Sequence, residues 1–235
     1  IHQKNGKQGN RLVSQRVLLS VFATILFYAC GSQQEESTAS EEKPAEEMTG
    51  ESQELSQLEK EHQLFRAGYA DSVNQGLITD DTMITSARRE ASAQVGDATV
   101  TVNYGSPGKR GRVLWNGLVS YDIIWVSGSH WATAVEFSED VMVGETTVPA
   151  GMYAFFTIPG RESWTLILNK NYDQHLAEDY EQAEDVLRVE VEPETLDEVV
   201  QRLTYEVEET APGEGEISLM WDQLRVSMPF TVAGS

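Results

Sequence analysis

Apolar and polar residues alternate along most of the chain between residues 84 and 233. A period of two is typical of strands that bury one face in a core and leave the other in water. The clearest alternating segments are residues 99–104, 133–138, 187–192, 203–208 and 225–232. The pattern predicts a series of half-buried β-strands in this part of the chain.

One segment of this region, residues 152–158, is apolar on both faces, so we expect it in the centre of a sheet. Residues 159–163 contain Pro and Gly and join it to the apolar residues 164–168 as a hairpin. Residues 172–184 form a long polar connection with room for a helical turn. Short strands separated by turn residues predict a single all-β domain over residues 84–233, an antiparallel sandwich or a barrel-like sheet.

A helical period of three to four residues occurs before this domain. It is marked by Leu55, Leu58, His62, Phe65 and Tyr69. Residues this far apart share one face of a helix, so the pattern predicts a helical stalk segment over residues 53–83 that packs on the domain. Gly76 is a suitable C-terminal stop for the helix. We expect His62 to be a partly buried packing residue rather than a ligand.

Residues 1–29 have the order of a signal peptide, a basic segment followed by an apolar run. The run comprises the thirteen residues 17–29, whereas a bilayer-spanning helix needs roughly 20 residues. Cys30, the only cysteine of the chain, follows at the position where bacterial lipoproteins carry their lipid, although Phe27 and Tyr28 are bulkier than the usual preceding residues. We expect an exported protein anchored to a membrane through Cys30. The alternative is a secreted protein with a free thiol.

The chain is strongly acidic, with 17 basic and 38 acidic residues and a formal net charge of −21 at pH 7. This negative charge repels phosphate backbones, so nucleic acid is not expected as a partner. The same charge would attract a basic envelope protein, which is therefore a suitable partner. Residues 30–52 are mainly Glu, Ser, Gln and Thr and predict a disordered acidic linker. Glu35 and Glu36 resemble acidic signals that direct some lipoproteins outward, although linkers are often acidic. We expect a monomer on the periplasmic or surface face of an outer membrane.

Positive charge is concentrated in residues 104–112, which carry Lys109, Arg110 and Arg112 among three glycines. Backbone exposed by glycine, together with cationic side chains, can bind a carboxylate or a phosphate. Clusters of Gly and Pro are also typical of an ordinary surface turn. The segment is therefore a candidate anion site with a simpler structural alternative.

A second loop, residues 126–130, lies between Trp125 and Trp131. The two rings could stack on a ligand such as the apolar face of a sugar, although Trp in a β-domain is more often a core residue. We expect the remaining tryptophans to pack in the core; they are Trp115, Trp164 and Trp221.

Catalytic and metal-binding patterns are weak. His130 and His175 lie on predicted loops and could bind a metal with Asp173 or Asp179, but their spacing matches no metal motif. We therefore expect no metal and no cofactor. No nucleophilic-serine motif of the GxSxG type is present, and the abundant carboxylates do not identify a glycosidase pair.

Residues 95–191 resemble an uncharacterised family of exported bacterial proteins, domain of unknown function 2911. The matching residues are Val102-Asn103-Tyr104, Pro107, Gly111-Arg112, Gly117-Leu118-Val119, Tyr121, Trp125, Gly128, Ala132-Thr133, residues 149–153, residues 156–159, Trp164, residues 169–171 and residues 185–188. The resemblance implies an all-β fold in an exported and often lipidated protein, and it implies no activity.

The chain departs from the family pattern at two loops. Val126 stands where the family has Arg, His130-Trp131 where it has Asn-Glu, and Ser106 where it has Arg before the proline. These polar positions are where the resemblance places the function of the family. Their replacement implies either a different ligand, with His130 and Trp131 as substitutes, or a lost activity.

Together these features favour a non-catalytic binding or envelope-associated module for a small ligand, a saccharide or a basic envelope protein. The candidate groove residues are Tyr104, Arg112, Trp125, His130, Trp131 and Lys170. One alternative is a hydrolase acting on an envelope or extracellular saccharide or peptide, and another is a structural surface protein. Convergence of Arg112, His130 and Lys170 on one cavity would favour binding or catalysis, whereas loops at opposite ends of the domain would favour the structural alternative.

Overall fold

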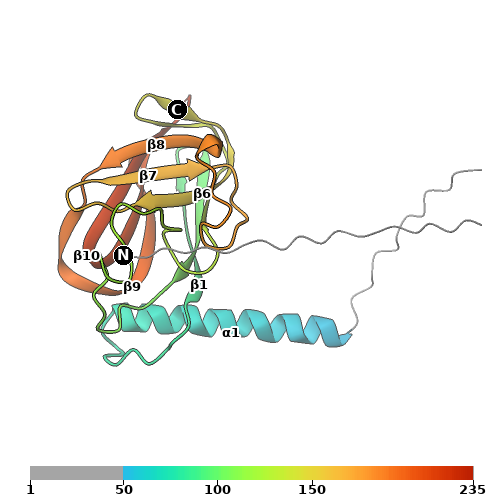
Figure 1. Cartoon of the computed structure of the whole chain (residues 1–235). Coiled ribbons are helices and arrows are strands. Elements are labelled where there is room, and N and C mark those ends of the chain that lie inside the picture. Colours follow the sequence, from blue (N-terminus) through green and yellow to red (C-terminus); the bar gives the residue numbers. More distant parts are fainter. Residues whose placement is uncertain (1–49, 235) are drawn as a thin grey trace, which may run out of the picture. The chain divides into compact units, whose positions relative to one another are not determined.

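The structure is a computed structural model that describes residues 50–234, with side chains from residue 57 onward. It confirms the all-β prediction, because two antiparallel sheets pack face to face (Figure 1). The predicted signal peptide, Cys30 and most of the predicted acidic linker lie outside the described residues. Among the described residues, no helix is both long enough and apolar enough to cross a membrane.

Ten strands, one α-helix and one 3-10 helix make up the described chain. In order, they are α1 (Gly50–Asn74), β1 (Ala87–Val95), β2 (Ala98–Ser106), β3 (Thr133–Phe137), β4 (Val141–Val143), β5 (Thr146–Val148), β6 (Gly151–Ile158), β7 (Trp164–Asn169), η1 (Gln182–Glu184), β8 (Asp185–Val191), β9 (Glu194–Ala211) and β10 (Glu214–Val232). The six-stranded sheet has the order β1-β2-β3-β6-β7-β8, and the four-stranded sheet has the order β5-β4-β10-β9. Both sheets are open, so the domain is a sandwich rather than a barrel.

Strand β6 occupies the central position that its doubly apolar sequence predicts. Tyr153 and Phe155 belong to the main core, whereas Ala154 and Phe156 face a second apolar cluster. The polar connection between β7 and β8 covers this second face, where the ring of Tyr180 contacts Phe156 edge-on at 5.2 Å. Both faces of β6 are therefore shielded from water, which explains why the alternation disappears in this strand.

Tyr180 also fixes the end of that connection. Its hydroxyl donates to the Asp185 carboxylate at 2.8 Å, and Arg188 donates to both groups. Burial first, and then the neighbouring carboxylate, raise the pKa of Tyr180 to about 12. The phenol consequently remains protonated, and continues to donate its hydrogen bond, at alkaline pH values where an ordinary tyrosine would ionise.

Four tryptophans form a cluster at one end of the core. The ring of Trp115 lies 4.9 Å from Trp164 and 6.0 Å from Trp221, both in edge-on geometry. Trp125 stacks on Trp221 at 6.1 Å. The predicted packing role of Trp115, Trp164 and Trp221 is confirmed, and Trp125 joins them.

Helix α1 differs from its prediction in what it buries. It starts at Gly50, three residues before the predicted segment 53–83, and ends at Asn74, two residues before the predicted stop at Gly76, so residues 75–83 are not helical. Leu58, His62 and Phe65 are exposed rather than packed. Ala70 and Val73, in its last turns, are buried. The helix is longer than the surface on which it packs, and its first turns extend past the sheets (Figure 1). A periodic stripe shows which face of a helix is apolar, but not how much of that face a partner covers.

Candidate functional site

Two of the predicted groove residues belong to the core. Tyr104 is fully buried, and its ring lies 4.8 Å from Tyr205 on the opposing sheet. Burial, the largest influence, raises the pKa of Tyr104. Trp125 is half-buried in the tryptophan cluster, and its indole N–H donates to the carbonyl oxygen of Gly128 at 3.2 Å. The side chains of Tyr104 and Trp125 hold the adjoining loops in place. Neither lines any of the cavities described below.

The basic segment after β2 uses much of its charge internally. Lys109 forms an ion pair with Asp222, and Arg112 donates to the carbonyl oxygens of Gly108 and Lys109. Arg110 is exposed, with its backbone in the left-handed region at a φ of 49°. These contacts favour the simpler interpretation of the segment, a turn closed by its own cations.

His130 and Trp131 lie beside the β7–β8 connection. His130 is exposed, and its carbonyl oxygen accepts the amide N–H of Leu176 at 2.7 Å. Trp131 is 52% exposed and contacts the ring of His175 edge-on at 5.8 Å. Lys170 lines a separate cavity that is rich in carboxylates and does not include Trp131. The structure therefore does not gather the predicted residues into one cavity.

A shallow cavity of about 350 Å³ lies beside Trp131 on the outer face of the six-stranded sheet. Its lining residues are Arg88, Asn103, Trp131, Ala132, Ala134, Met152, Tyr172 and Asp173. A larger groove of about 910 Å³ between α1 and β1 shares Arg88 and Asn103 with it. The cavity and the groove therefore adjoin, and the exposed rings of Trp131 and Tyr172 lie near the guanidinium of Arg88.

Arg88 is the cation shared by the two depressions. Its guanidinium donates to the carbonyl oxygen of Asn103 at 3.3 Å, and it has no ion-pair partner among residues 57–234. Desolvation in the groove lowers the pKa of Arg88. The neighbouring Arg89 points inward and pairs with Asp71. Arg88 is exposed at the surface, and a guanidinium without an ion-pair partner among the described residues is suited to binding a carboxylate or another anion.

Sequence reasoning identified Trp131 but not its neighbours in the cavity. A signal for Arg88 was present, because the alternation of β1 places Arg88 and Arg89 on opposite faces of the strand. Tyr172 carried no comparable signal, because its approach to Trp131 depends on how the β7–β8 connection folds back. Within the described part of the chain, no group of three or more His, Cys, Asp or Glu side chains is placed to hold a metal.

The fold is that of an antiparallel β-sandwich protein, preceded by a helix, with an aromatic cavity on one face. The chain belongs to the family described as Protein of unknown function (DUF2911), whose model matches residues 86–230. The match includes all residues of the cavity and the sandwich except the last two residues of β10, and it begins after α1. Comparisons with curated proteins and with solved structures gave no match.

Proposed function

We propose that this protein is a lipid-anchored, extracytoplasmic binding module, and that its ligand is a saccharide carrying a carboxylate. The observation that supports this most directly is the cavity where the half-exposed ring of Trp131 and the exposed ring of Tyr172 adjoin the guanidinium of Arg88, which has no ion-pair partner among the described residues. Aromatic rings offer flat apolar surfaces to the C–H face of a sugar, and a guanidinium binds a carboxylate through two parallel hydrogen bonds.

The remaining polar groups of the cavity suit the same ligand. The side-chain amide of Asn103 makes no hydrogen bond within the described residues, so its donors and acceptor remain available for hydroxyl groups. Asp173 adds an exposed carboxylate that accepts hydrogen bonds. Met152 supplies a partly exposed apolar wall. A few polar groups around an apolar surface are typical of ligand sites.

Replacing Trp131 with Ala is expected to weaken binding of acidic oligosaccharides at least about tenfold, equivalent to roughly 1.4 kcal/mol. Arg88→Gln should weaken binding of acidic but not of neutral sugars, because only the carboxylate contact is lost. Calorimetric titration with matched acidic and neutral oligosaccharides measures both effects. Lys170→Gln, in the separate acidic cavity, is the matched control and should bind normally. Unchanged affinity in Trp131→Ala would contradict this site.

The anchor is supported by the basic and apolar residues 1–29, by the solitary Cys30 and by the acidic residues that follow it. Changing Cys30 to Ser removes the thiol that acylation requires, so the protein should move from the membrane fraction to the soluble fraction. Immunoblotting of fractionated cells measures this distribution, with Ser32→Ala as a control that should remain membrane-bound. Continued membrane association of Cys30→Ser would exclude a lipid on this residue.

A further inference from the structure

Arg202, on β9, is fully buried, and its side chain is surrounded mainly by one short part of the chain. The guanidinium pairs with the Asp81 carboxylate at 2.7 Å and donates to the carbonyl oxygen of Met83 at 2.6 Å. It also donates to the carbonyl oxygens of Thr85 and Ser106, each at 3.2 Å. Of these four partners only Ser106, on β2, belongs to the sandwich. The others come from the segment between α1 and β1.

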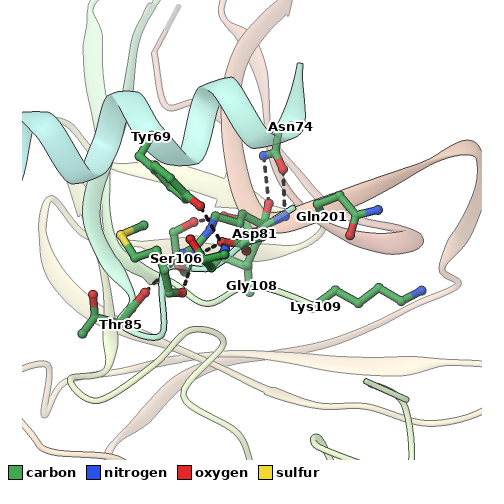
Figure 2. Close-up of polar contacts among 12 residues, drawn as sticks. Tyr69, Asn74, Asp81, Thr85, Ser106, Gly108, Lys109 and Gln201 are labelled. Atoms are coloured by element: carbon green, nitrogen blue, oxygen red, sulfur yellow. Dashed lines mark hydrogen bonds and ion pairs between the residues drawn. The ribbon is translucent and has the colours of Figure 1, made fainter. Parts of the chain in front are cut away.

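The backbone of Arg202 is held by the same part of the chain. The side-chain amide of Asn74, the last residue of α1, accepts the N–H of Arg202 at 2.7 Å and donates to its carbonyl oxygen at 2.9 Å. The ring of Tyr69 lies 5.6 Å from the guanidinium carbon, and its hydroxyl accepts the N–H of Thr82 at 3.0 Å. Figure 2 shows Tyr69, Asn74 and Asp81 grouped beside Ser106, Gly108 and Gln201. We call residues 69–85 the strap.

The sandwich has space for a carboxylate at this position. Gly108 lies against Asp81 so closely that a Cβ on residue 108 would overlap the second carboxylate oxygen. That oxygen, Oδ2, is buried without a hydrogen-bond partner in the described part of the chain, and so is Nε of Arg202. Asp81 therefore uses only part of the bidentate capacity of the guanidinium, because a side-on carboxylate would also engage Nε.

The strap is attached to the sandwich through these polar contacts, through the ion pair of Asp71 with Arg89 and through the buried side chains at the end of α1. It contributes no strand to either sheet, and Leu77 and Ile84 are exposed, whereas Ala70 and Val73 are buried. The family match begins at residue 86, so the matched unit contains Arg202, Ser106 and Gly108 but not Asp81. A fully buried guanidinium within that unit consequently takes its counter-ion from outside it.

We propose that Arg202, Ser106 and Gly108 form a carboxylate-binding site of the β-sandwich, and that the strap docks into it as an in-chain ligand through Asp81. The class of ligand is a peptide carboxylate. A buried guanidinium without a counter-ion is costly, so the folded sandwich favours the state in which a carboxylate occupies the site. This site lies apart from the cavity at Trp131, shares no residue with it, and does not depend on the saccharide proposal.

Chemical rescue in the full chain tests the site. Asp81→Ala removes the carboxylate and leaves space for formate, which should raise the thermal midpoint of this variant saturably, by about 2–4 °C, because a ligand that binds the folded state stabilises it. Chloride at the same concentration is the salt control. Glu216→Ala, which removes the carboxylate paired with Arg225, is the matched variant and should not respond. An equal response to formate and chloride would overturn the proposal.

Asp81→Asn keeps the shape of the side chain and removes its charge. This second variant tests whether the strap docks on the sandwich as a separable ligand or folds with it as an integral part. Amide hydrogen exchange should accelerate at least about tenfold within residues 69–85 and stay within about twofold in β6 and β7, because local opening leaves the sandwich folded. An equal loss of protection in the strap and in β6 would show a single cooperative unit and refute docking.

Discussion

Replacing Trp164 with Ala is expected to lower the free energy of unfolding by about 3–5 kcal/mol. Trp164 begins β7 and is fully buried, with the ring of Trp115 at 4.9 Å. Its removal empties a large volume between the sheets that neither neighbouring strand can fill, because both are paired along their length. Urea unfolding followed by far-ultraviolet circular dichroism measures the loss.

Two further variants separate the cost of the empty volume left by Trp164→Ala from other effects of this substitution. Trp131→Ala removes the same side-chain type from a half-exposed position and should cost less than about 1 kcal/mol, because it creates no buried cavity. Trp164→Phe should cost less than Trp164→Ala, since the buried indole N–H of Trp164 has no hydrogen-bond acceptor to lose. Similar losses in Trp131→Ala and Trp164→Ala would contradict the assignment of Trp164 to the centre of the core.

Most strands were predictable because they bury one face, which makes apolar residues recur at every second position of the sequence. The alternation in residues 203–208 and 225–232 predicted parts of β9 and β10, and the doubly apolar residues 152–158 predicted the central place of β6. The same logic was incomplete for α1. Leu58 and Phe65 lie on the same face of the helix as Tyr69, but they lie beyond the sandwich and are exposed.

The cavity was less predictable, because its members meet only through the tertiary fold. Arg88, Asn103 and Met152 come from three strands, and Tyr172 comes from a connection that folds back over the sheet. Each is an ordinary outward-facing or loop residue in its own segment. Sequence reasoning could assign a face to each strand residue, but strand order and the path of the connection decide which faces adjoin.

The two glycine-bearing loops show a different limit of prediction from sequence. Residues 104–112 and 126–130 were candidates for a shared ligand site, and the fold does bring them together. Two of their glycines serve backbone packing, since Gly105 of β2 lies against Ser129 and Gly128 lies against Gly105, whereas Gly108 leaves space for the Asp81 carboxylate. Glycine permits a turn, an anion-binding backbone or a close contact, and sequence alone does not distinguish among these uses.

Gly105→Ala is accordingly expected to cost about 3 kcal/mol, at the upper end of the usual range for overpacking. A Cβ on residue 105 would lie 2.5 Å from both the carbonyl oxygen and the hydroxyl oxygen of Ser129. The Ser129 loop is poorly able to withdraw, because the carbonyl oxygen of Ser127 accepts the hydroxyls of Tyr205 at 2.8 Å and Thr133 at 3.0 Å. Urea unfolding measures the loss of stability.

Gly68→Ala is the matched control for this substitution, with an effect of opposite sign. Gly68 is an exposed residue of α1, and an added Cβ would meet no atom within 4 Å. Alanine should therefore stabilise the helix by about 0.5–1 kcal/mol through its better helix propensity. If Gly105→Ala were as well tolerated as Gly68→Ala, the Ser129 loop would be free to move. Trp131, two residues after Ser129, would then not be held in a fixed position.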